Sequence, residues 1–474
     1  MSDILFHHAQ IITMDNTHPL AKAMLVDAQG RILALDPQYI PENATHIDLK
    51  GTTIIPGFYD SHCHLWKWGL RLTAQVDVSH VESVVKTLRE YAEKRPVGKW
   101  IIARGTQANI TQADLDAVST DHPIVFSVKE QRIVNTAAIR AAGLNLSDSV
   151  LSVSAEKKIR AAMPPLKDED YVEAILTACY RLIEMGVTAA ADPLLTPRLT
   201  RIYREIEADL PIRVVGYPIR RAEGATTNDP MPDYYSSKQL KIDGVKFFAD
   251  GGATNMTAGV SQPYINGKKG RLYYNPTELK AEMQAVADCG LGVITHAIGD
   301  EAIGMVLEAY TGLDVACRIE HLGLPTQEQL QQAADMGVMV STQPAFLPAF
   351  GGQMRRVLNP AYHEFCYPFR AMFDAGIMTA FSSDMPFVQT PHPLHAIQAA
   401  QDRLCEDGLP LAEKQSVTWE EAIRAYTLHG AVVCGDAADY GSLSPGKWAD
   451  FVVLNNEEIQ HVYIHGKIAQ HNKR

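Results

Sequence analysis

The chain has 474 residues, of which 46% are hydrophobic and 21% are charged; this globular composition argues against general disorder and leaves room for one large domain with one or two smaller ones. A formal net charge of −12 at pH 7, with no cluster of Lys and Arg, argues against a nucleic-acid partner. Because no long apolar run is present and the seven cysteines are scattered without a repeated spacing, we expect a cytoplasmic protein with no membrane partner.

Short β-rich segments open and close the chain. Before Pro56, four apolar segments are separated by Asp, Asn, Gly and Pro turn signals, which predicts a small antiparallel sheet. These segments are Ile4–Ile12, Ala23–Val26, Arg31–Leu35 and Thr53–Ile55. Two further strand-like segments, Asp450–Leu454 and His461–Ile464, follow a turn near the other end. We therefore expect residues 1–53 and 440–474 to build one composite β-sandwich domain.

The long middle of the chain alternates amphipathic helical stretches with short apolar strands, which is typical of parallel βα units. We expect eight such strands: Ile54–Asp60, Val187–Asp192, Arg213–Tyr217, Val245–Asp250, Val293–His296, Cys317–His321, Val338–Gln343 and Met378–Asp384. Apolar runs without alternation indicate strands that are buried on both faces, so the pattern favours a barrel over an open sheet. The predicted fold is therefore α/β, a (β/α)8 TIM barrel over residues 54–439.

An unusually long stretch separates the expected first and second barrel strands. Residues 65–173 contain a helical segment at Val81–Lys94 and a β-like segment at Pro123–Val128. A structureless connection of that length would be uncommon in a compact domain. We expect an inserted subdomain that forms a lid or wall beside the barrel mouth, with Ile124–Val128 outside the barrel.

The segment Pro56-Gly57-Phe58-Tyr59-Asp60-Ser61-His62-Cys63-His64 places two histidines at the end of the expected first strand. Side chains at positions i and i+2 share a face, so His62 and His64 can direct their imidazoles at one metal ion. Cys63 points the other way, and we expect it to be a packing residue. A single His-x-His motif is weak evidence for a metal site, so the interpretation depends on the residues that accompany it.

Four later strands each end in a residue that can bind a metal: Lys246, His296, His321 and Asp384. Each alone has an ordinary explanation: Lys246 as a surface charge at a strand edge, either histidine as a hydrogen-bonded core residue, and Asp384 as the N-cap of the next helix. Catalytic groups of barrel enzymes lie at the C-terminal ends of several strands. The shared position of these residues therefore predicts a metal site built together with the two strand-one histidines.

This order of residues resembles the amidohydrolase superfamily. Further motifs resemble its N-substituted formamide deformylase-like branch (YtcJ-like, amidohydrolase 3) over essentially the whole chain: Gly57 to Asp77, Gly98-Lys99-Trp100-Ile101, His122-Pro123-Ile124-Val125 with Val134-Asn135, Lys246 to Gly251, His296-Ala297-Ile298-Gly299-Asp300 and Gly446-Lys447-Trp448-Ala449-Asp450-Phe451. The resemblance implies a barrel with a β-sandwich from both termini, one or two divalent ions, usually zinc, and hydrolysis of C–N bonds.

The resemblance also implies roles for the site residues. The implied metal ligands are His62, His64, Lys246, His296, His321 and Asp384. Asp384 would also act as general acid and base on a metal-activated water. Lys246 would be carboxylated to a carbamate that bridges two ions, because a free ammonium would repel a cation; the alternative is an amine beside a mononuclear site. Asp250 and Asp300 are candidates either for orienting ligands or for capping turns.

Several residues around the expected mouth are candidates for substrate contacts: Trp66, Gln343, Phe346 and Phe387, with Trp68 and His395. Trp66 and Trp68 have an alternative role in packing the insert onto the barrel. The insert departs from the branch at Gly105-Thr106-Gln107 and at Lys129-Glu130-Gln131, where relatives often carry Gly-Trp-Asp and Asp-Gly-His. The substrate preference of the family therefore does not transfer to this chain.

Three functions stay open. The first is a metal-dependent hydrolase that cleaves an acyclic amide, N-acyl or N-formyl bond of a small-molecule substrate. The second is a deaminase or cyclic-amide hydrolase acting on a heterocycle, which a mononuclear site without a carbamate would favour. The third is a catalytically degenerate regulatory protein of the same fold, although the complete set of barrel ligands argues against it. We expect the first function; the sequence leaves open the substrate, the native metal and whether the chain forms a homo-oligomer.

Overall fold

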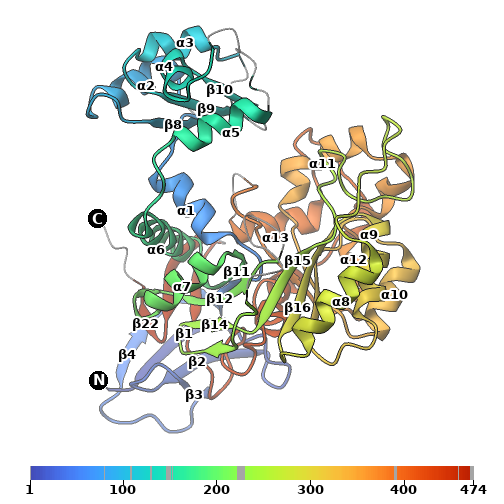
Figure 1. Cartoon of the computed structure of the whole chain (residues 1–474). Coiled ribbons are helices and arrows are strands. Elements are labelled where there is room, and N and C mark those ends of the chain that lie inside the picture. Colours follow the sequence, from blue (N-terminus) through green and yellow to red (C-terminus); the bar gives the residue numbers. More distant parts are fainter. Residues whose placement is uncertain are drawn as a thin grey trace. The chain divides into compact units, whose positions relative to one another are not determined.

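The computed structural model of the chain describes residues 2–79, 81–106, 109–128, 131–145, 151, 153–220, 230–388, 392–456 and 458–469. Helices and strands alternate along most of this length, and the fold is mixed α/β. The chain divides into two compact units: one contains Met1–His64 and Cys179–Arg474, and the other contains Leu65–Ala178 (Figure 1). Among the described residues, no helix combines the length and the apolar character needed to cross a membrane.

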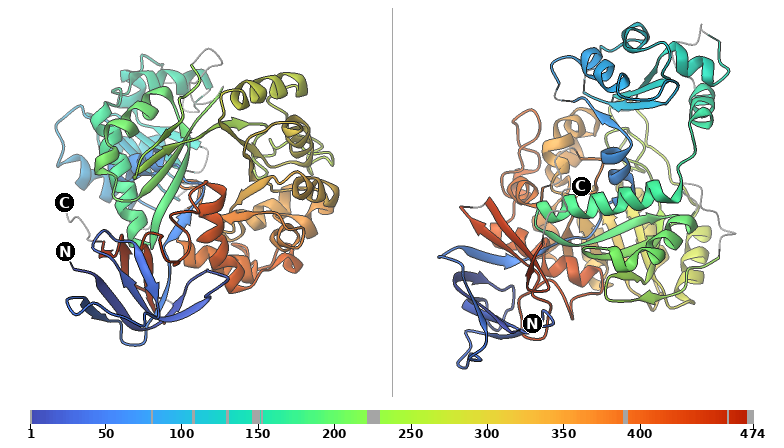
Figure 2. Two further views of the ribbon diagram at one scale, coloured as in Figure 1. Left: turned by 90° about the horizontal axis from the view of Figure 1, so that it is seen from below. Right: turned by 90° about the vertical axis from the view of Figure 1, so that its left-hand side faces the viewer.

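Strands from both ends of the chain form one eight-stranded sheet in the first unit (Figure 2). Its order is β22-β21-β20-β5-β1-β2-β3, and β4 also pairs with β1. The strands are β1 Ile4–Ile12, β2 Leu20–Val26, β3 Ile32–Leu35, β4 Thr45–Asp48, β5 Thr53–Pro56, β20 Phe451–Asn455, β21 Glu458–Ile464 and β22 Lys467–Ile468. Most pairs in this sheet are antiparallel, as expected, but β1 runs parallel to β4 and β5, so the sheet is mixed. Hydrophobic alternation indicates the buried face of a strand and does not indicate the direction of its neighbours.

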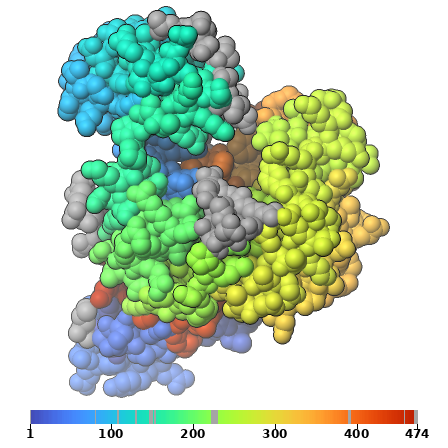
Figure 3. All heavy atoms as spheres, in the orientation of Figure 1, coloured from blue at the N-terminus to red at the C-terminus, as the bar shows by residue number. Residues whose placement is uncertain are grey.

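Aromatic residues from the two ends share the core of this sheet. The ring centroid of Phe6 lies 5.0 Å from that of Phe451 and 5.2 Å from that of Tyr463, and Phe451 and Tyr463 stack at 4.5 Å. Figure 3 shows blue N-terminal atoms beside red C-terminal atoms on one face of this unit. Neither end buries its apolar face alone, so the two ends stabilise each other.

The first unit also contains two five-stranded sheets. The first has the order β13-β14-β12-β11-β6 and the second has the order β15-β16-β17-β18-β19. Their strands are β6 Phe58–Asp60, β11 Val187–Leu195, β12 Arg213–Pro218, β13 Tyr235–Ser236, β14 Leu240–Ile242, β15 Gly244–Phe248, β16 Gly292–Ala297, β17 Cys317–His321, β18 Met339–Thr342 and β19 Thr379–Phe381. All pairs in these sheets are parallel except β13 with β14.

The expected strand Ile54–Asp60 is wrong as a single element. Its first residues belong to β5 of the eight-stranded sheet and its last residues belong to β6, with Gly57 between them. A Cβ atom at Gly57 would lie 2.2 Å from the hydroxyl oxygen of Thr188, so glycine is required where the chain passes from one sheet to the other. Pro56-Gly57, a turn signal, interrupts the apolar run at this change of sheet.

Helices follow most of these strands, as the alternation predicts. In the first unit they are α7 Pro197–Glu205, α8 Pro276–Ala287, α9 Asp300–Tyr310, α10 Gln327–Asp335, α11 Phe346–Val357, α12 Phe369–Asp374, α13 Pro393–Asp402, α14 Trp419–Ala425 and α15 Leu428–Val433. The N-cap side chains of Thr196 and Asn275, each followed by proline, accept backbone hydrogen bonds and fix the starts of α7 and α8. Figure 1 shows α8, α9 and α10 on the same side of β15 and β16.

The second unit has its own sheet and core. Its strands, in the order β10-β9-β8-β7, are β7 Val76–Asp77, β8 Ile101–Arg104, β9 Ile124–Val128 and β10 Gln131–Val134. Its helices are α1 Leu65–Thr73, α2 Val84–Ala92, α3 Gln112–Val118, α4 Thr136–Ala141 and α5 Val153–Ala162, followed by α6 Asp168–Glu184, within which the division falls. The strand Ile124–Val128 pairs only within this sheet among the described strands. Leu88, Leu115 and Phe126 are buried in its core.

Candidate active site

His62 and His64 follow β6 and are both buried. Their Nε2 atoms lie 3.4 Å and 3.0 Å from the same atom, Oδ1 of Asp384. Backbone hydrogen bonds hold this arrangement, because the amide of Asp384 donates to the carbonyl of His62 and the amide of His64 donates to that of Met385, each at 2.8 Å. One ligand atom from each of the three side chains lies within 4.8 Å of the others, which suits a single metal ion.

Asp384 lies just beyond β19 with a φ of +51°, a left-handed conformation that is uncommon for aspartate. The next helix, α13, has His392 as its N-cap, so the alternative role of Asp384 as that N-cap is wrong. Burial raises the pKa of Asp384, but His62 and His64 outweigh burial and hold this pKa well below its usual value. The carboxylate is therefore ionised at neutral pH.

His296 and His321 extend the cluster from β16 and β17. The ring of His321 lies 5.1 Å from that of His62 and 4.6 Å from that of His296. Nδ1 of His321 donates to Oε1 of Gln343 at 2.6 Å, which leaves Nε2 with its lone pair. Burial, with help from His296, lowers the pKa of His321 well below its usual value, so this imidazole is neutral. A neutral imidazole is the form that binds metals.

Lys246 on β15 is fully buried, so its alternative role as a surface charge is wrong. Its Nζ has no hydrogen-bond partner among the described residues and lies 5.1 Å from the ring centroid of Phe248. Burial lowers the pKa of this amine to about 8. An unpartnered buried amine is costly. A bound group that accepts from Nζ, or a modification that removes its charge, would relieve this cost.

The other candidate residues have distinct surroundings. The amide of the buried Gln343 also donates from Nε2 to the hydroxyl of Ser382 at 3.0 Å. Phe346 stacks on His321 at 5.9 Å, and the ring of Phe387, 52% exposed, lies 5.6 Å from His64. Trp66 is in the second unit, where its ring lies 5.9 Å from that of Tyr171.

Asp250 faces the cluster as well as capping a turn. Its Oδ1 lies 3.2 Å from Nε2 of His296 and accepts from the amide of Ile298, while its Oδ2 accepts from Gly259 and Gly299. Asp300 instead accepts from the amide of Ser261 and the hydroxyl of Tyr362. Both residues hold loops, and among the described contacts only Asp250 lies next to a histidine of the cluster.

The model of the amidohydrolase family matches residues 45–465. The chain belongs to the amidohydrolase family. This amidohydrolase is 24% identical over 521 residues to the N-substituted formamide deformylase of Arthrobacter pascens, covering 97% of this chain and 94% of that protein. It is 26% identical over 513 residues to Protein LONG AFTER FAR-RED 3 of Arabidopsis thaliana, covering 96% and 87%. Family membership makes it an enzyme of carbon–nitrogen bonds other than peptide bonds.

A solved structure resembles this amidohydrolase over nearly its whole length. The crystal structure of an uncharacterized metal-dependent hydrolase from Pyrococcus furiosus has a TM-score of 0.81 and 25% sequence identity, covering 95% of this chain and 98% of that one. The likeness includes the α/β fold that carries the histidine cluster.

One residue of the amidohydrolase site had no role in the sequence prediction. Glu320 on β17 is fully buried, accepts a hydrogen bond from Nδ1 of His62, and forms an ion pair with Nε of Arg318 at 2.6 Å. Burial raises the pKa of Glu320, but Arg318 and His62 outweigh it and hold this pKa well below its usual value. The available signal was the pair of charges at positions i and i+2 in an otherwise apolar strand, which indicates a partner across the buried face.

Proposed function

We propose that the buried cluster is a divalent metal centre that hydrolyses a C–N bond of a small molecule. Its ligands would be His62, His64, His296, His321 and Asp384, with Lys246 beside them. The observation that carries the proposal is the approach of two Nε2 atoms, from His62 and His64, to one oxygen of Asp384. Imidazole and carboxylate ligands suit zinc or a similar borderline ion, and the similar Pyrococcus furiosus protein is described as metal-dependent.

The proposed barrel would explain how residues from five strands meet. Two links support closure of the two five-stranded sheets into one (β/α)8 barrel. At one edge, Ser383 donates its amide to the carboxylate of Asp60 at 3.0 Å, beyond β19 and at the end of β6. At the other edge, Ile219 bridges to Lys246 in parallel, beyond β12 and within β15. The C-terminal strand ends that carry the cluster would then open at one mouth.

The chain's own residues would divide the work of hydrolysis. A divalent metal, when bound, would polarise the substrate carbonyl and make water a better nucleophile. Asp384, ionised at neutral pH, would accept the proton of that water on its carboxylate and pass it to the departing amine. Asp250 and Gln343 would fix the rings of His296 and His321 through the contacts described above.

We propose further that Lys246 is a carbamate in the active enzyme. The ammonium would first lose a proton; the neutral Nζ would then attack carbon dioxide, form the N–C bond as one C–O π bond opens, and lose a second proton. A buried cation would thereby be replaced by an anion with two ligand oxygens. The buried, unpartnered amine with a pKa of about 8 supports this, because a deprotonated fraction is available near neutral pH. Protein exchanged into ¹³C-bicarbonate should give a carbamate carbon signal that disappears in the Lys246→Arg variant.

We also propose a domain division, substrate contacts and a cellular location. The domains would be a composite β-sandwich of 1–53 and 440–474 and a barrel of 54–439 with an inserted subdomain at 65–173; strands from both ends in one sheet and a compact unit starting at Leu65 support this division. Phe346 and Phe387 would contact substrate. Seven free cysteines support a cytoplasmic location.

The test of the proposed function is a substrate screen with metal analysis. Tag-free protein would be assayed for metal content and then offered N-formyl amines, N-acyl amines and cyclic amides or aminoheterocycles, with and without a chelator. We expect hydrolysis of an acyclic N-formyl or N-acyl amine that is inhibited by the chelator. Turnover confined to the heterocycles would favour the alternative reaction, and turnover that survives complete metal removal would contradict the metal-dependent mechanism.

A further inference from the structure

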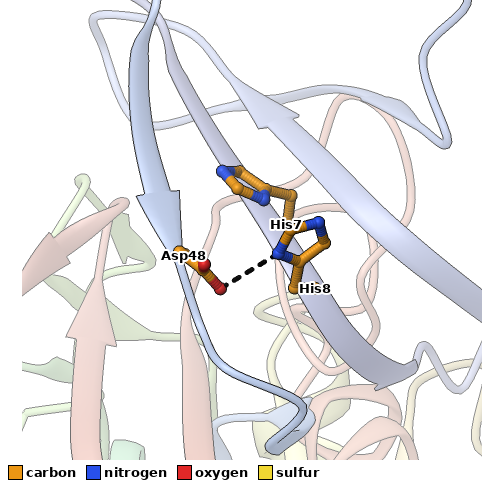
Figure 4. Close-up of side chains that lie close together, drawn as sticks. All are labelled: His7, His8 and Asp48. Atoms are coloured by element: carbon orange, nitrogen blue, oxygen red, sulfur yellow. Dashed lines mark ion pairs between the residues drawn. The ribbon is translucent and has the colours of Figure 1, made fainter.

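A second group of potential metal ligands lies on the eight-stranded sheet, outside the active site (Figure 4). His7 and His8 are on β1 and Asp48 is the last residue of β4. One ligand atom from each of these side chains lies within 4.8 Å of the others, and Nδ1 of His8 is 3.2 Å from Oδ1 of Asp48. His8 and Asp48 are exposed and His7 is half-buried, so ions in solution can reach all three.

The backbone explains why two consecutive residues of one strand meet the same carboxylate. His7 and Asp48 are register partners in the parallel pair of β1 and β4. His8 would ordinarily point to the opposite face of the sheet. Its φ of +56°, at an irregularity in the pairing of β1 with β2, breaks that alternation, and its side chain reaches Asp48 as well.

A third imidazole lies beside this group. His46 precedes Asp48 by two positions on β4, so both side chains are on the same face of the sheet. Its ring centroid is 5.6 Å from that of His7, whose ring is 4.5 Å from that of His8. Three imidazoles and one carboxylate are a donor set for zinc, copper or nickel, whereas magnesium and calcium prefer oxygen ligands.

We propose that His7, His8 and Asp48 bind a borderline transition-metal ion such as Zn²⁺ at the surface, with His46 as the nearest further donor. The ion would join β1 to β4, two strands that are distant in the sequence but paired in the sheet. Binding would therefore stabilise the sheet that both chain ends build. The site is separate from the buried cluster and does not depend on the proposed function.

Zinc binding by matched variants of the tag-free full chain tests this site. The test variant is His7→Gln/His8→Asn, because asparagine tolerates the left-handed backbone at position 8 and both amides are poor ligands. The matched control is His18→Ala, which removes a half-buried histidine that also pairs with an aspartate, Asp36, at 3.3 Å. Melting curves in chelator would establish that all the proteins are equally folded.

Equilibrium dialysis against buffered Zn²⁺ should show one ion more per chain in the wild type and in His18→Ala than in the double variant. The Asp48→Asn variant should weaken zinc binding by at least about tenfold. Loss of a metal ligand should cost more affinity than loss of a residue that only hydrogen-bonds to a ligand. Hydrolysis should be unchanged in each variant. Equal zinc stoichiometry and affinity in the wild type and the double variant would overturn the proposal, leaving His8 and Asp48 as a surface ion pair; loss of the same ion from His18→Ala would also overturn it.

Discussion

Glu320 accepts a hydrogen bond from Nδ1 of His62, and both side chains are buried. Because Nδ1 is engaged, Nε2 of His62 is the atom left to face Asp384, at 3.4 Å. Arg318 in turn pairs with Glu320 and also donates to the carbonyl of Val433 at 3.0 Å. The charge of Glu320 therefore sets the direction in which His62 presents its lone pair.

Replacing Glu320 by glutamine should weaken metal binding without unfolding the protein. The amide has the shape of the carboxylate but lacks its charge, so it holds the His62 ring less firmly. We expect metal affinity to fall by about 10- to 100-fold and activity to recover at high metal concentration. Metal titration of the variant checks this, with Glu328→Gln, an exposed position on α10, as the control. Unchanged metal affinity in Glu320→Gln would contradict the positioning role.

Asp384→Asn should separate turnover from metal binding. Asparagine keeps an oxygen that can coordinate but cannot take up the proton, so we expect kcat to fall by at least ~10²-fold while much of the metal and the substrate affinity are retained. His62→Ala should instead lose metal, with activity partly restored by excess metal. Steady-state kinetics and metal content of both variants distinguish these outcomes. Near-normal turnover in Asp384→Asn would exclude Asp384 as the base.

Asp450 should make stability depend on pH. Its Oδ1 accepts from the amide of His465 at 2.7 Å, its Oδ2 has no partner among the described residues, and burial raises its pKa to about 7. The folded state therefore keeps this proton while the unfolded chain loses it near pH 4, and stability falls as pH rises from about 4 to about 7. Asp450→Asn removes this titration, so the variant should gain up to a few kcal/mol over the wild type above pH 7 and match it below pH 4. Denaturant melts at both pH values measure the difference; a constant difference across the range would contradict this origin.

Asp436 should be important for stability rather than for catalysis. It pairs with Nε of Arg213 at 2.8 Å and Nζ of Lys241 at 3.0 Å, and accepts from the hydroxyl of Tyr59, all buried. Asp436→Ala would leave the buried guanidinium of Arg213 without a carboxylate partner among the described residues and Lys241 with Asp243 alone, and should cost about 3–5 kcal/mol of unfolding free energy. Glu205→Ala, which breaks an exposed pair with Arg201, should cost only about 0.3–0.5 kcal/mol. Equal losses in the two melts would contradict the argument.

Local patterns predicted several strands well. Ile4–Ile12 and Cys317–His321 have the predicted bounds because apolar runs between clear turn signals define them. The change of sheet at Gly57 was not predicted, since it results from a close contact with Thr188 that is remote in the sequence. The direction of β4 and β5 relative to β1 likewise depends on the path of the intervening chain.

The sequence also indicated more of the candidate metal ligands than of the residues that hold those ligands in place. The i, i+2 spacing singled out His62 and His64, and the position at the end of a predicted strand singled out Asp384; the structure places these three side chains together. The role of Glu320 was not predicted, because it depends on a contact with His62 on another strand, which spacing within one strand does not encode. The sequence also did not predict the group of His7, His8 and Asp48, because this group depends on a left-handed residue, His8, inside a strand.

Anomalous diffraction at the zinc edge, from crystals of protein that hydrolyses a substrate, would locate the proposed metal ion. We predict a peak at about 2.0–2.2 Å from Nε2 of both His62 and His64, with an oxygen of Asp384 beside it. A peak near His7 and His8 would belong to the proposed surface site and would not replace this one. Active, metal-replete crystals with no metal peak between His62, His64 and Asp384 would rule out the proposed metal centre.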